Sequence, residues 1–277
     1  MFTLGQYHNF NIVKELDFGI YLDGEELGEI LMPLKYVPED VHEGDVITAF
    51  LYRDSEDRLI ATTEKPLAVL DDFALLRVVA VTEAGAFLYW GLVKDLFVPF
   101  REQKEKMKEG ESYLVKIYLD DETNRLMASS YIEKFLNNIP VNFKQGDEVE
   151  LIIAEKNDLG YKAVINGTHS GILYKNEIFQ PLNPGEHVTG YIKKIREDEK
   201  IDLSLHSFGY SKIEDLEKEL TLLLQQNNGF LPLNDKSHPE EIKRLCHMSK
   251  KNFKKVLGSL YKKRSISLDD EGIKLVN

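Results

Sequence analysis

The chain has 277 residues, of which 35 are Lys or Arg and 47 are Asp or Glu, so its formal net charge is −12. Hydrophobic residues make up 43% of it, enough to fill packed cores and to argue against a disordered protein. The most apolar stretches are much shorter than the ~20 residues of a membrane-spanning helix, and the first ten residues lack the pattern of a secretory signal. A single cysteine excludes an internal disulfide and a multi-cysteine metal site. We therefore expect a cytoplasmic protein with no membrane partner.

Three strand-rich units repeat along the chain before residue 210. A glycine begins a strand-like run in each unit, at Gly19, Gly85 and Gly160, so the spacings are 66 and 75 residues (85 − 19 and 160 − 85). A second glycine and the start of a closing strand keep nearly the same spacings. These landmarks are Gly44 and Arg58, Gly110 and Arg125, and Gly185 and Lys200. Repetition at a fixed period indicates copies of one structural unit.

Each unit is predicted to form a small β-barrel. Its short strands alternate residues that face opposite sides, as in VITAF at 46–50, which is typical of half-buried strands. Polar, turn-rich segments join the strands. A sheet this small can bury one face and remove its edges by closing on itself, and a five-stranded barrel does both. We expect barrels over residues 1–70, 71–140 and 141–209.

The hydrophobic period changes after residue 210. Leucines three and four residues apart predict a helix that ends near Gly229. A second helix is predicted to start at Pro239 and a third near Ser249, and their order with a strand-like run at 230–233 and a final hairpin is typical of a winged helix-turn-helix over 210–277. The predicted fold is therefore mainly β, with three tandem five-stranded barrels followed by a C-terminal α/β module.

These residues resemble a known family. The three repeats resemble S1-type RNA-binding domains, which are OB-fold barrels, and the motif Phe18-Gly19-Ile20-Tyr21 carries this resemblance. The whole chain is similar to the bacterial conserved virulence factor B family, which has three such barrels and a C-terminal winged helix. The most specific stretches are GYKAVING, REDEKIDLSL, DKSHPEEI and MSKKNFKKVLGSLYKK, which start at residues 160, 196, 235 and 248. The resemblance implies an RNA-binding regulator of gene expression.

The resemblance also implies which barrel side chains contact RNA. S1-type barrels stack bases on aromatic residues and hold phosphates with a nearby cation. The corresponding residues are Phe18, Tyr21 and Arg58 in the first repeat, Phe87 and Arg125 in the second, and Tyr174, Arg196 and Lys200 in the third. The third repeat departs most from the pattern, because Leu159 and Lys162 stand at its two stacking positions and Tyr174 replaces a family histidine. Packing inside the barrel is the alternative role for each aromatic ring.

Charge is distributed unevenly along the chain. The three barrel segments carry net charges of −9, −3 and −3, and residues 210–277 carry +3. Because affinity for nucleic acid depends on neutralising phosphates, we expect the first barrel to bind poorly and the winged helix to bind best. Six lysines in and after the third helix are predicted to contact nucleic acid: Lys250, Lys251, Lys254, Lys255, Lys262 and Lys263. A solvated basic face is the alternative interpretation.

The sequence gives no sign of catalysis. It contains no HExxH, P-loop, GxGxxG or GxSxG motif, and its seven histidines are scattered. Cys246 and His247 are adjacent but are expected near a helix end, where a buried structural cysteine is the favoured interpretation. We therefore expect no enzyme activity, no cofactor, no metal and no small-molecule substrate.

The sequence favours a non-enzymatic regulator that binds single-stranded RNA through the winged helix and the second and third barrels. Two other functions stay open. The winged helix is also compatible with a DNA-binding transcription regulator. The acidic first barrel is also compatible with a protein-interaction scaffold that binds a basic partner from the transcription or translation machinery.

Overall fold

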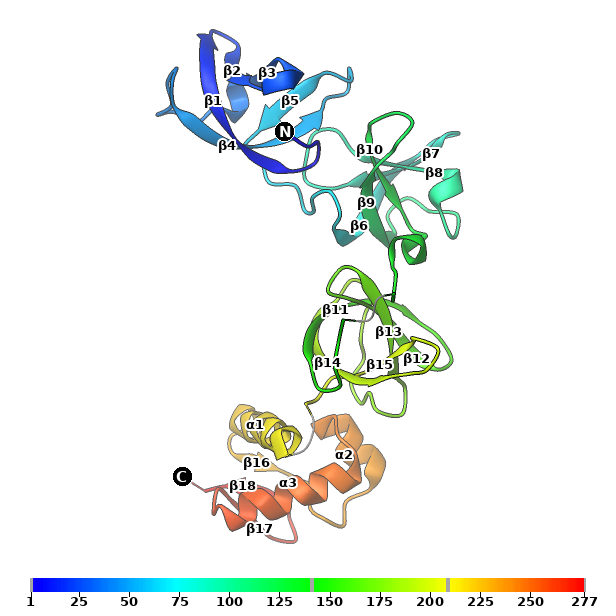
Figure 1. The fold of residues 1–277 in the computed structure, drawn as a ribbon. Helices are drawn as coiled ribbons and strands as arrows, with labels where there is room; N and C mark the ends of the chain where they lie inside the picture. The colour runs from blue at the N-terminus through cyan, green and yellow to red at the C-terminus, as the bar shows by residue number, and fades with distance from the viewer. Residues whose placement is uncertain (1, 140–141, 208–209, 277) are drawn as a thin grey trace. The chain divides into compact units, whose positions relative to one another are not determined.

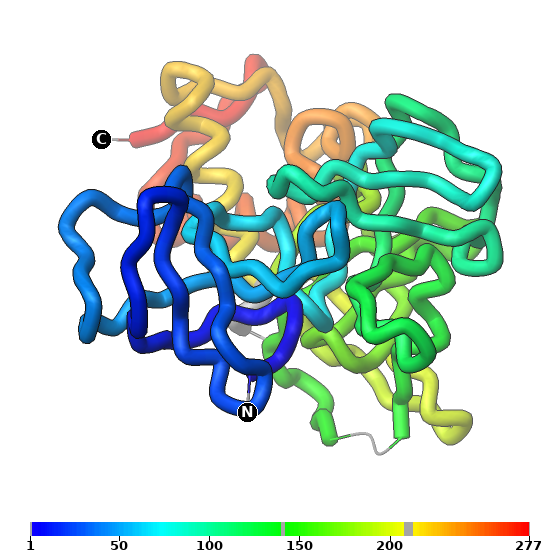
Figure 2. Tube along the Cα trace, turned by 90° about the horizontal axis from the view of Figure 1, so that it is seen from above, coloured from blue at the N-terminus to red at the C-terminus, as the bar shows by residue number. Residues whose placement is uncertain are grey.

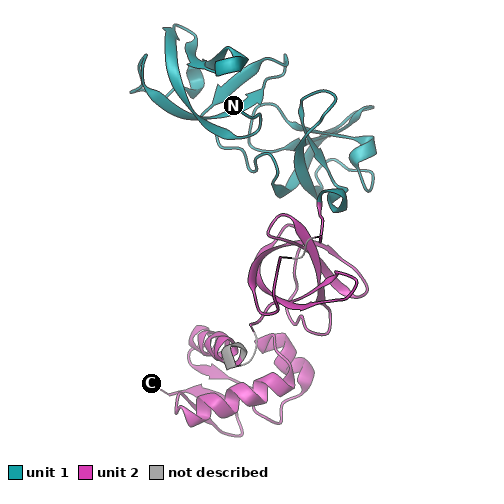
Figure 3. Ribbon diagram, in the orientation of Figure 1, with its two compact units in different colours: residues 1–135 teal, residues 136–277 magenta. Residues whose placement is uncertain are grey.

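The computed structural model describes residues 2–139, 142–207 and 210–276. The chain divides into two compact units, Met1–Phe135 and Leu136–Asn277 (Figure 3). The first unit holds two closed barrels, and the second holds a third barrel and the C-terminal helices (Figure 1).

Each barrel has five short strands. The first contains β1 (Tyr7–Leu16), β2 (Gly19–Asp23), β3 (Glu29–Pro33), β4 (Val46–Arg53) and β5 (Leu59–Thr62). The second contains β6 (Phe73–Val81), β7 (Gly85–Tyr89), β8 (Leu96–Pro99), β9 (Ser112–Leu119) and β10 (Leu126–Ser129). The third contains β11 (Glu148–Lys156), β12 (Gly160–Ile165), β13 (His169–Tyr174), β14 (His187–Ile195) and β15 (Ile201–Ser204). Short 3-10 turns lie at Glu25–Leu27, Leu34–Tyr36, Phe100–Glu102 and Ile132–Phe135.

The three barrels have one topology. In the first, the closed order is β1-β2-β3-β5-β4, and the other two repeat it strand for strand. The third and fifth strands of each barrel pair in parallel, whereas the other pairs are antiparallel. Each first strand carries a register shift at the same place, as between Ile12 and Lys14 in β1. Figure 2 shows the strands of the first barrel, in blue, side by side along the chain trace.

The repeated glycines explain part of this identity. Gly19, Gly85 and Gly160 start the second strand of each barrel with a positive φ of 152°, 158° and 156°. A Cβ atom at these positions would lie 2.2, 2.3 and 2.0 Å from a backbone carbonyl oxygen of the third strand. Only glycine therefore allows the second and third strands to approach this closely.

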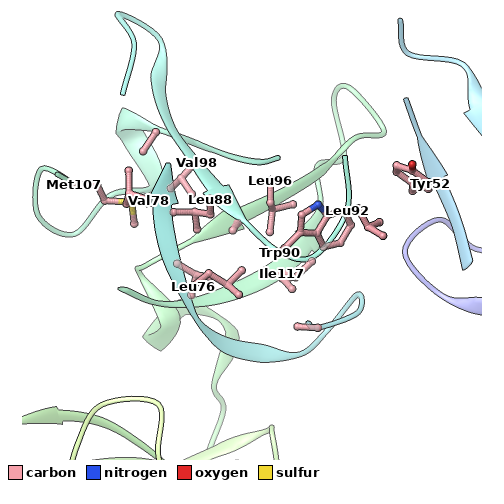
Figure 4. Packing of buried hydrophobic residues seen from close by; sticks show 14 of the residues in the cluster. Tyr52, Leu76, Val78, Leu88, Trp90, Leu92, Leu96, Val98, Met107 and Ile117 are labelled. Carbon is pink, nitrogen blue, oxygen red and sulfur yellow. The ribbon is translucent and has the colours of Figure 1, made fainter. Parts of the chain in front are cut away.

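The first two barrels share a core. Phe50 and Tyr52 of β4 are buried in the same apolar cluster as Trp90 and Leu92, which follow β7. The rings of Phe50 and Trp90 meet edge to face, with centroids 5.8 Å apart. Figure 4 shows Trp90 and Leu92 between the interior of the second barrel and Tyr52 of the first. The two barrels are therefore held as one body by apolar burial.

The C-terminal residues form the winged helix. The helices are α1 (Tyr210–Gln226), α2 (Pro239–Cys246) and α3 (Lys250–Lys262), and a small sheet joins β16 (Phe230–Leu231), β18 (Ile273–Leu275) and β17 (Ile266–Leu268) in that order. The second and third helices start where the sequence predicts. His238 caps α2 ahead of Pro239, and the Ser249 hydroxyl caps α3 by accepting from the Asn252 N–H at 3.2 Å. The predicted fold class is thus confirmed.

We expect Trp90→Ala to destabilise both barrels of the first unit, because the ring contributes to both cores. Loss of a buried tryptophan side chain costs about 3–5 kcal/mol. Native-state hydrogen exchange should show faster exchange in β4 and β5 as well as in β7 and β8. Leu257→Ala, in the core of the winged helix, is the control and should leave these strands unchanged. Loss of protection confined to the second barrel would contradict the shared core.

Candidate nucleic-acid interface

The first barrel places its two predicted stacking residues together. The ring of Phe18 is 56% exposed and meets the ring of Tyr21 edge to face, with centroids 6.4 Å apart. The Nζ atom of Lys14 lies 5.7 Å from the centre of the Tyr21 ring. Phe18 is therefore an outward-facing ring rather than a core residue, and a base could stack on it.

The predicted cation of this barrel is already paired. Arg58 donates from Nε and Nη2 to Oδ2 of Asp54, at 2.9 and 2.7 Å, and also contacts Glu56 at 3.1 Å. Partial burial acts to raise the pKa of Asp54, but the hydrogen bonds from Arg58 outweigh it and hold that pKa below its usual value. A phosphate would have to compete with two carboxylates for Arg58.

The second barrel pairs Phe87 with a ring that the sequence analysis did not select. Phe97 of β8 lies beside Phe87 of β7, with ring centroids 5.1 Å apart, and both rings are half-buried. Strand alternation could have indicated Phe97, because its neighbours Leu96 and Val98 face the core. Arg125, the residue before β10, forms two hydrogen bonds with Asp57 of the first barrel, at 3.1 and 2.9 Å. Phe87, Phe97 and Arg125 line a cavity of about 570 Å³.

The third barrel gathers cations around Tyr174. The guanidinium carbon of Arg196 and the Nζ atom of Lys193 each lie 5.8 Å from the centre of the Tyr174 ring. The Tyr174 hydroxyl donates to Oδ1 of Asp202 at 3.2 Å, and Nε of Arg196 donates to the same oxygen at 2.8 Å. Tyr174 and Arg196 were predicted from the sequence, whereas Lys193, which also pairs with Glu177, was not.

Lys200 lies apart from that hydrogen-bond network. Its Nζ atom donates to Asp198 at 2.8 Å in the β14–β15 turn, and its side chain is 69% exposed. This hydrogen bond lowers the pKa of the Asp198 carboxyl. Lys200 is accessible, but its charge is locally balanced.

Three of the six predicted lysines of the winged helix contact their own domain. Lys250 donates to the backbone carbonyls of Lys236 and Ser237, at 3.3 and 2.8 Å. Lys254 lies 3.8 Å from Asp235. Lys263 donates at 2.5 Å to Glu217 of α1, whose side chain is only 8% exposed. Lys263 therefore has a structural partner that the sequence did not reveal.

The other three lysines form what we call the cationic stripe: Lys251, Lys255 and Lys262. They lie within about 40° of one another around the axis of α3, opposite the buried Phe253 and Leu260. All three are exposed. In the part of the chain that the structure describes, no carboxylate is within ion-pair distance of them. The stripe is therefore the part of the predicted site that keeps its charge available.

The single cysteine, Cys246, is buried in the core of the winged helix. Burial raises the pKa of the Cys246 thiol to about 12, so it stays protonated near neutral pH. Among the described residues, no group of three or more His, Cys, Asp or Glu side chains is placed to hold a metal ion. None of the described helices is long and apolar enough to cross a membrane.

Two family models match the chain. Residues 4–64 match the S1 domain, and residues 218–275 match the CvfB-like winged helix domain. Both are nucleic-acid-binding domain classes rather than enzyme classes. The protein is therefore of a nucleic-acid-binding class built from S1-like barrels and a winged helix.

The similar proteins define the family more closely. The uncharacterized protein YitL of Bacillus subtilis is 30% identical over 274 residues, which cover 93% of this chain and 89% of YitL. Conserved virulence factor B of Staphylococcus epidermidis is 26% identical, with coverage of 86% and 82%. A crystal structure from Streptococcus pneumoniae, described as a multidomain protein with nucleic acid binding domains, is 24% identical with a TM-score of 0.44 and coverage of 99% and 98%. The chain belongs to the conserved virulence factor B family.

We expect Lys263→Ala to destabilise the winged helix, because it leaves the buried Glu217 carboxylate without its cation. Removing one partner of a buried polar group costs about 1–3 kcal/mol. Lys262→Ala is the matched control, because Lys262 is adjacent to Lys263 in the sequence but belongs to the cationic stripe and has no carboxylate partner among the described residues. Hydrogen exchange of α1 and α3 should become faster only in Lys263→Ala. Equal exchange in the two variants would show that the Glu217–Lys263 pair does not support the fold.

Proposed function

We propose that this protein is a cytoplasmic regulator of gene expression that binds single-stranded RNA, and that it has no catalytic activity. The cationic stripe of α3 carries the proposal, because it is an exposed row of lysines without carboxylate partners among the described residues. The regulatory part rests on the family to which the chain belongs, since the resemblance implies RNA-binding regulation.

The distribution of charge supports the winged helix as the main electrostatic contact. Residues 210–277 are the only one of the four segments with a positive net charge, +3 against −9, −3 and −3. Phosphate contacts supply most of the sequence-independent affinity for nucleic acid. Lys251 and Lys262 are eleven residues apart, so the stripe is about 16 Å long. That length suits the phosphates of an extended strand.

The barrels support a single strand as the ligand. Bases stack on exposed aromatic rings only when they are unpaired, and the Tyr174 ring lies beside Arg196 and Lys193, for which a phosphate would compete with Asp202 and Glu177. Duplex RNA hides its bases in a major groove too narrow for side chains to read. We propose the segments 1–70, 71–140, 141–209 and 210–277 as successive domains. Weak sites on the last three would gain avidity by binding the same strand.

We expect the triple variant Lys251→Ala, Lys255→Ala, Lys262→Ala to bind single-stranded RNA more weakly and with less salt dependence. Each phosphate contact on a single strand contributes about 0.7 to the slope of log K against log salt, so the slope should fall by about 2. Fluorescence anisotropy with labelled U-rich and A-rich RNA at several salt concentrations measures both.

The matched control removes three lysines that are already ion-paired in the same domain, in the variant Lys218→Ala, Lys236→Ala, Lys274→Ala. It has the same net charge and should keep the wild-type slope. Equal losses in both triple variants would contradict a specific role for the stripe. Tighter binding of duplex DNA than of RNA would favour a transcription regulator, and no binding to any nucleic acid at low salt would favour a protein scaffold.

Tyr174 in the third barrel is the predicted stacking residue that a ring variant can test. Tyr174→Leu removes the ring and should weaken RNA binding about fivefold or more, because base–aromatic stacking is worth about 1–3 kcal/mol. Tyr174→Phe keeps the ring and loses only the hydroxyl bond to Asp202. The same anisotropy titration should therefore place Tyr174→Phe close to wild type. If both variants bind like wild type, Tyr174 is not a stacking residue.

A further inference from the structure

The outward face of α3 carries a glycine that the fold of the chain does not require. Gly258 lies in the helix interior, on the side opposite the buried Phe253 and Leu260, and it is exposed. A Cβ atom added to Gly258 would meet no other atom within 4 Å. Its φ is not among the positive values that favour glycine. Neither packing nor backbone conformation therefore explains why this position has no side chain.

A glycine at this position makes the helix less stable. Glycine loses more backbone entropy on folding than any other residue, and alanine is the residue that helix interiors favour most. Glycine is used where a backbone has to come very close to a ligand or to another backbone. Since no described residue of this chain lies against Gly258, the group that makes such a close contact has to come from outside the chain.

Exposed side chains surround Gly258 on the helix surface. Residues three and four positions apart are neighbours on an α-helix. For Gly258 these neighbours are Lys254, Lys255, Tyr261 and Lys262, and all four are exposed. Because the glycine has no side chain, the helix backbone is bare at the centre of this ring of residues. We call Gly258 and its four neighbours the Gly258 site.

The Gly258 site is cationic. Lys255 and Lys262 belong to the cationic stripe, and Lys254 adds a third charge that Asp235, 3.8 Å away, partly balances. Along the helix axis, Gly258 lies about 4.5 Å from Lys255 and about 6 Å from Lys262. A phosphate near Gly258 would therefore be within reach of both lysine side chains. Three lysines favour an anionic ligand over an apolar side chain of a protein partner.

Tyr261 adds an aromatic ring to the Gly258 site. Tyr261 is 58% exposed, and among the described residues its hydroxyl has no hydrogen-bond partner. A ring that is exposed in this way is available for an unpaired base to stack on it. The sequence analysis did not select Tyr261 or Gly258, because it followed only the charges of this helix.

We propose that the Gly258 site binds one nucleotide of a single RNA strand. The phosphate lies between Lys255 and Lys262, the ribose lies against the bare backbone of Gly258, and the base stacks on Tyr261. The inference rests on the proposed RNA-binding function and adds the point at which the strand comes closest to α3. The glycine weakens the helix, and the close approach of the strand is what it makes possible.

Two substitutions of Gly258 test this close approach in the full chain. Gly258→Ala should slow hydrogen exchange of α3 about fivefold, because alanine favours the helix. It should nevertheless weaken binding of single-stranded RNA about fivefold or more, because an added methyl group does not fit a close contact. Gly258→Lys should bind no more tightly than wild type, although it adds a cation to the stripe. Fluorescence anisotropy with labelled U-rich and A-rich RNA measures the affinities.

Asn252→Ala is the matched control for helix stability. Asn252 is also in α3, alanine is also the better helix former there, and the two positions lie about 120° apart around the helix axis. This variant should slow hydrogen exchange of α3 and bind RNA like wild type.

Tyr261 is tested by a pair of ring variants. Tyr261→Leu removes the ring and should weaken RNA binding about fivefold or more, because the base loses its stacking partner. Tyr261→Phe keeps the ring and should bind close to wild type in the same anisotropy titration.

The outcomes separate this inference from the proposed function. If wild type binds single-stranded RNA and Gly258→Ala binds it equally well, the strand does not approach Gly258 and only the inference is wrong. Tighter binding by Gly258→Lys, or wild-type affinity in Tyr261→Leu, would also overturn the inference alone. If wild type binds no single-stranded RNA at low salt, both the proposed function and the inference are wrong.

Discussion

Barrel closure is the constraint on which this structure depends. Five strands of four to ten residues bury one face only if the sheet closes. Closure brings the second and third strands so close that no side chain fits between them at one position. A Cβ at Gly19, Gly85 or Gly160 would lie 2.0–2.3 Å from a carbonyl oxygen of the third strand. The closed barrel fixes which side chains point outward. Phe18, Phe87 and Tyr174 keep part of their rings accessible because of this geometry.

Ion pairs then decide which outward cations remain available. Many Lys and Arg side chains of this acidic chain lie beside carboxylates, and Arg58, Arg125 and Lys200 each have one close by. Such exposed pairs contribute little to stability, but a phosphate must displace them to bind. The cationic stripe differs because α3 turns its lysines away from the domain. The predicted cations without carboxylate partners among the described residues therefore lie on the winged helix, although the barrels carry more of the predicted aromatic rings.

The acidic first barrel forms one body with the second barrel. Phe50, Tyr52 and Trp90 share one core, so the first two barrels present a common surface rather than two separate ones. The loop after β4 reaches the face of the second barrel that carries Phe87. The first barrel therefore shapes the surface around Phe87 of its neighbour.

The sequence by itself determined the repeats, the closed barrels and the winged helix. Glycine spacing, strand alternation and helical caps are local signals, and His238, Pro239 and Ser249 act where they were expected. The sequence also predicted Tyr174 and Arg196 as contact residues of the same barrel, and the two side chains lie together. Only the tertiary structure decided that Lys263 belongs to Glu217, that Arg125 pairs with Asp57, and that Phe97 completes a cavity with Phe87. Each of these contacts joins residues distant in sequence or on neighbouring strands. Which carboxylate pairs with which cation depends on packing geometry, and neither the composition nor the hydrophobic period of the sequence determines it.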